Sequence, residues 1–284
     1  MRRRLLCQCG TWLALSSARA HLSTAAAAAS TGIPALAGSV AVVTGGSGAI
    51  GKAISQALVN SGATVVITGR RGDALESAAE RIMSVGDATG AAGSVHCAVA
   101  DVTCEDQVIG LFQRVIAEHG KCDILVNNAG IATGGDPVDI SGDAFSSVMD
   151  VNVLGPFLCS REAFRHMRQR GAGGRILNVA SISSQSPRPH SAPYTASKYA
   201  LQGLSRSFAL DGRPHGIAVS TIHPGNVASD LLSPEEIARR QESEGLMAPE
   251  DVAASILHMC SMPPGTNVLD MTVVPTRQPL IGRG

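Results

Sequence analysis

A tyrosine and a lysine four residues apart carry the clearest chemical signal in the sequence. Tyr194 and Lys198 stand in the segment YTASK, and a helix through this segment would put both side chains on one face. A nearby ammonium favours the phenolate form of a tyrosine and lowers its pKa. Tyr194 is therefore a candidate general acid toward a carbonyl, or general base toward an alcohol. Ser181, thirteen residues before Tyr194, could hold the oxygen that gains or loses the proton.

Other nucleophilic or metal-binding side chains give weaker signals. Ser183 and Ser184 are the alternatives to Ser181, although the spacing to Tyr194 favours Ser181. Cys159 and the eight histidines have no partner at ligand spacing, so we interpret them as structural or surface residues and expect no metal site.

A second candidate site lies in TGGSGAIGKA, residues 44–53. Its glycines fit a G-x-G-x-x-G dinucleotide loop, most of a P-loop, and approximately the G-x-S-x-G elbow of serine hydrolases. The segment follows a predicted strand and opens a predicted helix, which suits both phosphate-binding loops. A P-loop needs a hydroxyl after its lysine, where this chain has Ala53. The elbow lies on an internal strand and ends in glycine, whereas this is the first strand and ends in Ala49. The dinucleotide loop is therefore favoured.

The end of the second predicted strand indicates which dinucleotide binds. An acid there would hold the ribose 2′-hydroxyl of NAD, whereas an arginine accommodates the 2′-phosphate of NADP. The chain has VVITGRRGD, without a carboxylate at the strand end and with Arg70 and Arg71 next. We therefore predict NADP(H) in preference to NAD(H); the alternative is that both arginines are solvated loop residues.

The elements that must position these residues alternate regularly along the chain. Short β-rich runs occupy 39–45, 63–69, 94–101, 123–130, 175–181, 217–225 and 268–274, with helix-period segments between them. This pattern predicts an α/β fold, a doubly wound parallel β-sheet with helices on both faces, in one domain over 38–284. The helix after the third run is expected to start at a capping box formed by Thr103 and Asp106.

Several short motifs, taken in order, resemble the short-chain dehydrogenase/reductase family. They are TGGSGAIG at 44–51, DV at 101–102, NNAG at 127–130, Asn152, Ser181, YTASK at 194–198 and PGNVAS at 224–229. The resemblance covers about Val40 to Val274 and implies a Rossmann fold with hydride transfer between a nicotinamide and a carbonyl or alcohol carbon. It implies a catalytic tetrad of Asn152, Ser181, Tyr194 and Lys198. Lys198 would also bind the nicotinamide ribose, and Asn152, at a kink in a helix over 141–170, would hold the water of a proton relay.

The same resemblance assigns the cofactor contacts. They are Thr44, Gly45, Ser47, Ile50 and Gly51 at the pyrophosphate, Asp101 and Val102 at the adenine, Asn128, Ala129 and Gly130 at the adenosine ribose, and Pro224, Gly225 and Val227 at the nicotinamide carboxamide. Asn127 and Asn128 could instead be simple turn formers. The chain departs from the family pattern at Ala49, in place of a glycine, and at Ser229, in place of a threonine.

Composition excludes several classes of protein. Lys+Arg and Asp+Glu number 23 each, so no basic surplus indicates nucleic-acid binding. Seven cysteines without C-x-x-C pairs indicate buried thiols of a reducing compartment. No apolar run approaches the roughly 20 residues needed to span a membrane. We therefore expect a small-molecule substrate, no nucleic acid and no membrane span.

Residues 1–30 differ from the rest of the chain. They carry four arginines and no acid, with many Ala and Ser residues, which is typical of an organelle transit peptide. We predict a targeting leader that is cleaved or disordered, with the mitochondrion as the favoured destination. A plastid peptide, a secretory signal cut after Ala18-Arg19-Ala20, and an unprocessed tail of a cytoplasmic protein are the alternatives.

Substrate choice is the least determined property. Residues 228–245 form a charged helical lid with few aromatics, which favours a small or medium polar hydroxy or oxo substrate. A 3-oxoacyl-thioester reductase of organelle fatty-acid metabolism and a non-catalytic NADP(H)-binding sensor are the alternatives. By resemblance, helices over 141–170 and 192–212 would form a homodimer or homotetramer.

Overall fold

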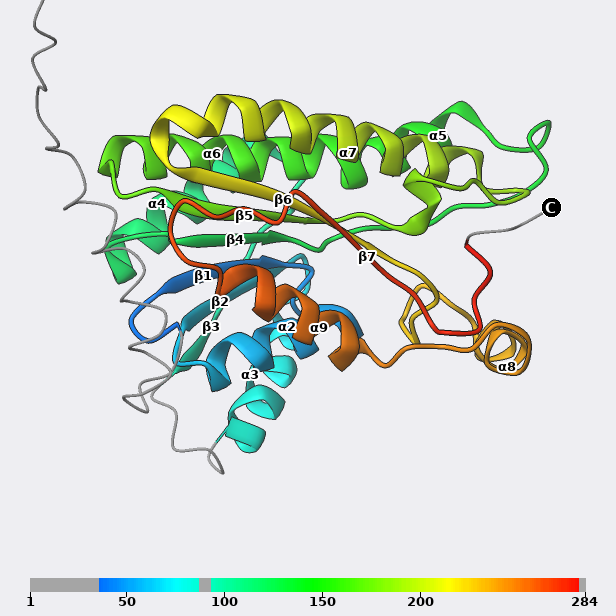
Figure 1. The fold of residues 1–284 in the computed structure, drawn as a ribbon, viewed down its shortest axis with the longest axis horizontal. Coiled ribbons are helices and arrows are strands. Elements are labelled where there is room, and N and C mark those ends of the chain that lie inside the picture. The colour runs from blue at the N-terminus through cyan, green and yellow to red at the C-terminus, as the bar shows by residue number, and fades with distance from the viewer. Residues whose placement is uncertain (1–35, 87–92, 281–284) are drawn as a thin grey trace, which may run out of the picture.

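A single sheet of parallel strands runs through the protein, in the order β3-β2-β1-β4-β5-β6-β7 (Figure 1). The computed structural model describes residues 36–86 and 93–280, so the predicted leader at 1–30 lies outside the described residues. The strands are β1 (Val40–Thr44), β2 (Thr64–Gly69), β3 (Ser94–Val99), β4 (Ile124–Asn127), β5 (Gly174–Val179), β6 (Ile217–Pro224) and β7 (Asp270–Val273).

The central strands are apolar along their whole length because both faces of the sheet are covered. Every residue of β1 and of β4 is buried, whereas the edge strand β3 exposes part of its length. Unbroken apolar runs of this kind are typical of parallel sheets buried on both sides.

Helices cover the two faces of the sheet in separate layers (Figure 1). On one face lie α2 (Ala49–Asn60), α3 (Gly72–Gly86) and α9 (Pro249–Cys260), packed on a core that includes Ile54, Leu75 and Ile256. On the other lie α4 (Glu105–His119), α6 (Gly155–Arg170) and α7 (Ala192–Gly212), with a core that includes Leu111 and Met167. The predicted doubly wound α/β fold is confirmed.

The predicted kink near Asn152 is a π-helical turn. The 141–170 segment divides into α5 (Gly142–Met149), the π-helix η1 (Asp150–Leu154) and α6. Such turns add a residue to the helix and are frequent at functional sites. A bulge at this point turns Asn152 inward, where it is buried.

The predicted capping box before α4 is wrong. The residue that caps this helix is Cys104, and no side chain makes the capping hydrogen bond. The hydroxyl of Thr103 instead donates to Asp101 Oδ1, two residues earlier, at 2.8 Å. Two short 3₁₀ turns, η2 (Ile182–Ser184) and η3 (Arg213–His215), and the helix α8 (Pro234–Ser243) complete the fold; α8 stands away from the sheet (Figure 1).

The sheet reverses its winding between β1 and β4, its two central strands. Helices leave the carboxyl ends of these strands toward opposite faces, which opens a crevice there. Ligands of doubly wound folds bind at this place, so the fold puts the glycine-rich loop after β1 at the expected position. No helix in the described ranges is long and apolar enough to cross a membrane.

Candidate active site

Ser181, Tyr194 and Lys198 meet at the carboxyl end of β5. The side chain of Ser181 forms a hydrogen bond with Tyr194, which stands in the first turn of α7. One turn further along α7, Lys198 Nζ lies 5.4 Å from the centroid of the Tyr194 ring and donates to Val179 O at 2.9 Å. Lys198 is buried, with 5% of its surface exposed. The structure therefore brings together the three residues that the sequence singled out.

Burial changes the acidity of both groups on α7. It raises the pKa of Tyr194, against the opposing effects of the Ser181 hydroxyl and of the positive charges of Arg188 and Arg240. It also lowers the pKa of Lys198 to about 8. The sequence predicted that Lys198 would lower the pKa of Tyr194. The net direction is the opposite, because burial disfavours the charged forms of both side chains, and the cations that oppose it at Tyr194 are the two arginines.

Asn152 supports the backbone beside these groups. Its Oδ1 accepts from Ile131 N at 2.9 Å, and its Nδ2 donates to Ile131 O at 2.9 Å and to Ser197 Oγ at 3.0 Å. A Cβ on Gly130 would lie 3.3 Å from Asn152 Oδ1, closer than most Cβ contacts. The π-helical turn thus links the segment after β4 to α7.

Asn127 is not a turn former but the last residue of β4. Its Nδ2 donates to Asn178 Oδ1 at 2.8 Å and to Ser160 Oγ at 2.9 Å, and Asn178 Nδ2 donates to Ser205 Oγ at 2.8 Å. This buried network joins β4 and β5 to α6 and α7, beneath the site.

The loop after β1 is shaped by its glycines. Gly45 has a φ of +64°, a left-handed conformation that glycine adopts freely. A Cβ on Gly46 would lie 2.5 Å from Ile67 Cβ, and one on Gly51 would lie 2.2 Å from Gly45 O. The loop therefore lies against β2 and the start of α2, leaving backbone N–H groups at the helix N-terminus, where an anion is stabilised.

The segment after β4 closes the other side of this loop. Thr44 Oγ1 accepts from the backbone N–H groups of Asn128 and Ala129, each at 3.0 Å. Asn128 Nδ2 donates to Thr44 O at 3.0 Å and to Gly45 O at 3.2 Å. The two central strands are thus joined where the sheet reverses, which fits a dinucleotide lying across this edge.

Comparisons with known proteins agree with this geometry. Residues 39–239 match the family described as short chain dehydrogenase. The chain belongs to the short-chain dehydrogenase/reductase family. It is 33% identical over 244 residues to farnesol dehydrogenase of Aedes aegypti, with 84% of this chain and 96% of that protein covered.

Two further similarities bear on chemistry. Over 229 residues the chain is 37% identical to cis-4-hydroxycyclohexanecarboxylate dehydrogenase of Sinomonas cyclohexanicum, with 78% of this chain and 89% of that protein covered. Its fold is similar to the crystal structure of a metagenomic short-chain oxidoreductase in complex with NADP. That similarity has a TM-score of 0.72 and 31% identity, over 85% of this chain and 99% of the other. The chain is thus an oxidoreductase of this family with a Rossmann fold.

Two of the predicted adenine and 2′-phosphate contacts, Arg70 and Asp101, line an open cavity of about 350 Å³ between the end of β2 and α5. Arg71, which follows Arg70 in the sequence, is exposed and is not part of that lining. Burial would raise the pKa of Asp101, but hydrogen bonds from Thr103 and the charge of Arg70 bring it below its usual value. Val102, which follows, is buried.

On the opposite side of the crevice, the PGN segment after β6 packs against the C-terminal tail. A Cβ on Gly225 would lie 2.1 Å from Gln278 Oε1, which accepts from Asn226 N at 2.8 Å. Val227 pairs with Met247 through an isolated β-bridge. Pro224 ends β6, so the predicted carboxamide contacts lie at the carboxyl end of this strand.

Asn226, within the PGNVAS motif, makes contacts that the sequence analysis did not predict. Its Oδ1 accepts from Arg188 at 2.8 Å and from Arg240 at 3.0 Å, and its Nδ2 donates to Glu244 at 2.9 Å. These contacts tie the lid helix α8 to the turn before α7. Arg188 and Arg240 both lie near predicted motifs in the sequence, but nothing in their spacing indicates that the two side chains meet at Asn226.

Asp230 was also missed. Its Oδ2 accepts from Ala49 N at 2.8 Å, so a lid carboxylate lies at the N-terminus of α2, beside Gly48 and the predicted pyrophosphate contacts Ser47 and Ile50. No group of three His, Cys, Asp or Glu side chains within the described ranges is placed to hold a metal ion. Cys159 is buried and its thiol is free.

Proposed function

We propose that this dehydrogenase uses NADP(H) to interconvert a carbonyl and a secondary alcohol. The observation that carries the proposal is the hydrogen bond between Ser181 and Tyr194, with Lys198 one helical turn away. Two hydroxyls that meet at the end of a strand can bind one substrate oxygen between them. When bound, the nicotinamide supplies or accepts the hydride.

The residues act in the reducing direction as follows. Ser181 donates a hydrogen bond to the carbonyl oxygen and stabilises the negative charge that develops there. Tyr194 gives its proton to the same oxygen. Because burial raises its pKa, Tyr194 keeps that proton at neutral pH. In the oxidising direction Tyr194 must first lose the proton, so oxidation requires a higher pH.

Lys198 and Asn152 support this transfer. We assign Lys198 to the nicotinamide ribose hydroxyls and Asn152 to the water through which Tyr194 exchanges its proton with solvent. The support is that Asn152 and Lys198 both lie beside Gly130, within 3.3 and 3.8 Å of the position its Cβ would take.

The preference for NADP(H) is supported by Arg70 and Arg71. Both follow β2 without an acid at the strand end, and both are exposed to a ligand in the crevice. The metagenomic structural neighbour is a complex with NADP, which agrees with the preference. The fit of the cofactor to the glycine-rich loop does not distinguish NADP(H) from NAD(H), because both dinucleotides carry the pyrophosphate.

A small or medium polar hydroxy or oxo substrate is the favoured class. The positive charges of Arg188 and Arg240 both act on Tyr194, which favours a polar substrate near the phenol. The Sinomonas relative is named for a compound that carries a hydroxyl and a carboxylate. The Aedes relative is named for farnesol, which makes an apolar alcohol the competing class.

A panel assay tests the proposal. NADPH oxidation is followed with 4-oxocyclohexanecarboxylate, farnesal and a 3-oxoacyl thioester, using the enzyme, Tyr194→Phe and Tyr199→Phe. Tyr199 is on the same helix but 45% exposed, so it is the matched control. Turnover of the oxo acid that Tyr194→Phe alone abolishes supports the proposal. Turnover of the thioester alone would identify the 3-oxoacyl reductase, and tight NADPH binding without turnover of any carbonyl would identify a sensor.

A homodimer or homotetramer is the proposed assembly. Large apolar side chains are exposed along the outer helices α5, η1, α6 and α7, namely Phe145, Leu154, Phe157, Tyr199 and Leu210. Burying them against a second copy would remove an apolar surface that monomers rarely expose. Light scattering of Leu210→Glu and the parent enzyme tests this, and the mitochondrial destination is tested by fusing residues 1–30 to a fluorescent protein.

A further inference from the structure

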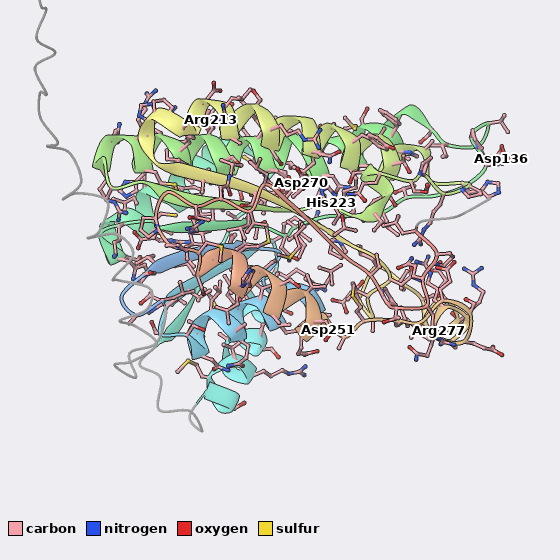
Figure 2. All side chains as sticks on the ribbon, viewed as in Figure 1. Asp136, Arg213, His223, Asp251, Asp270 and Arg277 are labelled. Carbon is pink, nitrogen blue, oxygen red and sulfur yellow. The ribbon has the colours of Figure 1, made fainter. Side chains whose placement is uncertain are left out.

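Behind Ser181 lies a chain of polar contacts that the reaction described above does not use. Ser184 Oγ lies 2.6 Å from Ser181 O and 2.6 Å from His223 Nδ1. On the other side of the ring, His223 Nε2 lies 3.0 Å from Asp270 Oδ1. His223 is on β6 and Asp270 begins β7, and Figure 2 shows the two labelled side by side.

The hydrogen-bond directions in this chain are constrained. Ser181 O can only accept, and it has two donors, the Ser184 hydroxyl at 2.6 Å and the Ser184 N–H at 2.9 Å. The Asp270 carboxylate accepts from His223 Nε2, and the 2.6 Å contact between His223 Nδ1 and Ser184 Oγ is a hydrogen bond whichever of the two atoms carries the proton. Both side chains are buried, Ser184 with 2% and His223 with 0% of its surface exposed. Water therefore does not replace a hydrogen-bond partner that either side chain loses.

The same carboxylate also reaches α7. Asp270 Oδ1 lies 3.4 Å from Gln202 Nε2, and Asp270 Oδ2 lies 3.6 Å from a terminal nitrogen of Arg206. Gln202 and Arg206 follow Lys198 at steps of four residues, so they continue the stripe of α7 that carries Tyr194 and Lys198. Asp270 therefore contacts α7 directly, and through His223 and Ser184 it contacts the turn formed by Ser181 and η2, called here the Ser181 turn.

We propose that His223 and Asp270 are positioning residues that hold the Ser181 turn at its distance from Tyr194. This inference rests on the proposed function, in which Ser181 and Tyr194 share one substrate oxygen. A small displacement of one of two groups that must meet at a single atom costs up to about 100-fold in rate. The Gln185 side chain, bonded to Thr272 Oγ1 at 2.9 Å, fixes the same turn to β7.

Paired substitutions separate positioning from packing. His223→Asn keeps an amide group, which can donate or accept, near the place of Nδ1, whereas His223→Gln keeps one near the place of Nε2. Because the contact to Ser184 reaches the Ser181 backbone, His223→Asn should keep more of kcat than His223→Gln. Ser184→Ala should lose about 10- to 100-fold in kcat with KM for NADPH within twofold, and Ser184→Thr should recover most of it.

Ser220→Ala is the matched control, because Ser220 is also buried on β6 but its hydroxyl bonds to Asn267, at 2.8 Å. It should leave kcat within twofold of the parent. The inference is overturned if the His223 and Ser184 variants behave like Ser220→Ala, or if His223→Asn and His223→Gln lose kcat equally with the same loss in stability.

Amide hydrogen exchange gives a readout that does not depend on turnover. The N–H of Ser184 donates to Ser181 O at 2.9 Å and that of Gln185 donates to Ile182 O at 2.9 Å. Both should exchange faster in Ser184→Ala and His223→Gln than in Ser220→Ala. If the parent enzyme turns over no carbonyl, the proposed function fails, and this exchange still decides whether the chain of contacts holds the turn.

Discussion

The carboxylate of Asp230, on the lid, accepts a hydrogen bond of 2.8 Å from the backbone N–H of Ala49, at the first turn of α2. An anion at a helix N-terminus is favoured by the helix dipole and the free N–H groups. In this structure the carboxylate of Asp230 occupies the N-terminus of α2. The dinucleotide pyrophosphate and Asp230 are both anions that prefer the same N–H groups, so they compete.

We therefore expect Asp230→Asn to bind NADPH about two- to fivefold more tightly, the size of an exposed charge effect at a helix terminus. The gain should shrink at high salt, which screens the charge. NADPH fluorescence titrations at two salt concentrations measure it. Glu235→Gln removes a charge from the same lid and is the control. Equal or weaker binding by Asp230→Asn than by Glu235→Gln would contradict the prediction.

The ionisation of Tyr194 should depend on Arg240. Removing a positive charge that lowers the pKa of Tyr194 leaves burial less opposed, so Arg240→Gln should raise that pKa further. The rise of kcat/KM for alcohol oxidation should move to higher pH by the same amount. Arg239→Gln, on the same helix but 71% exposed, should not move it.

The two tyrosines of the chain allow a direct check. In a Tyr199→Phe background, Tyr194 alone contributes phenolate absorbance, which can be titrated with and without Arg240→Gln. A titration that stays in place, or moves to lower pH, would show that the arginine does not act on the phenol.

Lys198 should cost the protein stability at neutral pH. Its pKa is about 8 in the folded state and 10.5 otherwise, so below pH 8 the folded protein carries a buried charge. Between pH 8 and 10.5 the unfolded chain binds the extra proton, and stability rises with pH. Lys198→Met should therefore stabilise by about 2 kcal/mol at pH 7, after allowance for the lost bond to Val179.

Denaturant unfolding at pH 7 and pH 10 measures this difference, which should be smaller at pH 10. Lys52→Met, a partly exposed lysine, should change stability by less than about 0.5 kcal/mol at either pH. A Lys198→Met protein that is less stable at pH 7 would rule out the penalty. The same variant should lose activity, as is common where a strained site serves function.

Cofactor preference should depend more on Arg71 than on Arg70. Arg70 lines the cavity with Asp101 and acts on its carboxylate, so part of its charge is already balanced, whereas Arg71 is exposed and lies outside that lining. Arg71→Ser should raise KM for NADPH about 10-fold and leave KM for NADH unchanged, because a charged hydrogen bond to phosphate is lost. Arg81→Ser, exposed on α3, is the control. A preference for NADPH that survives substitution of both arginines would refute their assignment to the 2′-phosphate.

The order of strands and helices along the chain, and the pairing of Tyr194 with Lys198, could be predicted because both depend on local sequence patterns. Unbroken apolar runs gave the buried strands, and the four-residue step put Tyr194 and Lys198 on one face. The position of Ser181 beside them followed from the family resemblance and from parallel strands ending at one edge.

The contacts that tune the site could not be predicted, because they join distant residues. Asp230 and Ala49 are 181 residues apart, and His223 and Asp270 are 47 apart, with nothing in either pair's own segment to indicate the other. The direction of the pKa of Tyr194 also depends on burial, which the sequence does not show. The helix start at Cys104 was missed because the hydroxyl of Thr103 bonds to Asp101.

Asn226 connects the C-terminal segment to the side chains around the substrate site. Its backbone N–H is held by Gln278, while its side chain holds Arg188 and Arg240 near the phenol. Gln278 in turn donates to Glu244 at 3.3 Å, just beyond the lid helix. Shortening or extending the protein near residue 278 would therefore change the contacts beside the substrate site while leaving the sheet intact. A purification tag placed there would change substrate selectivity.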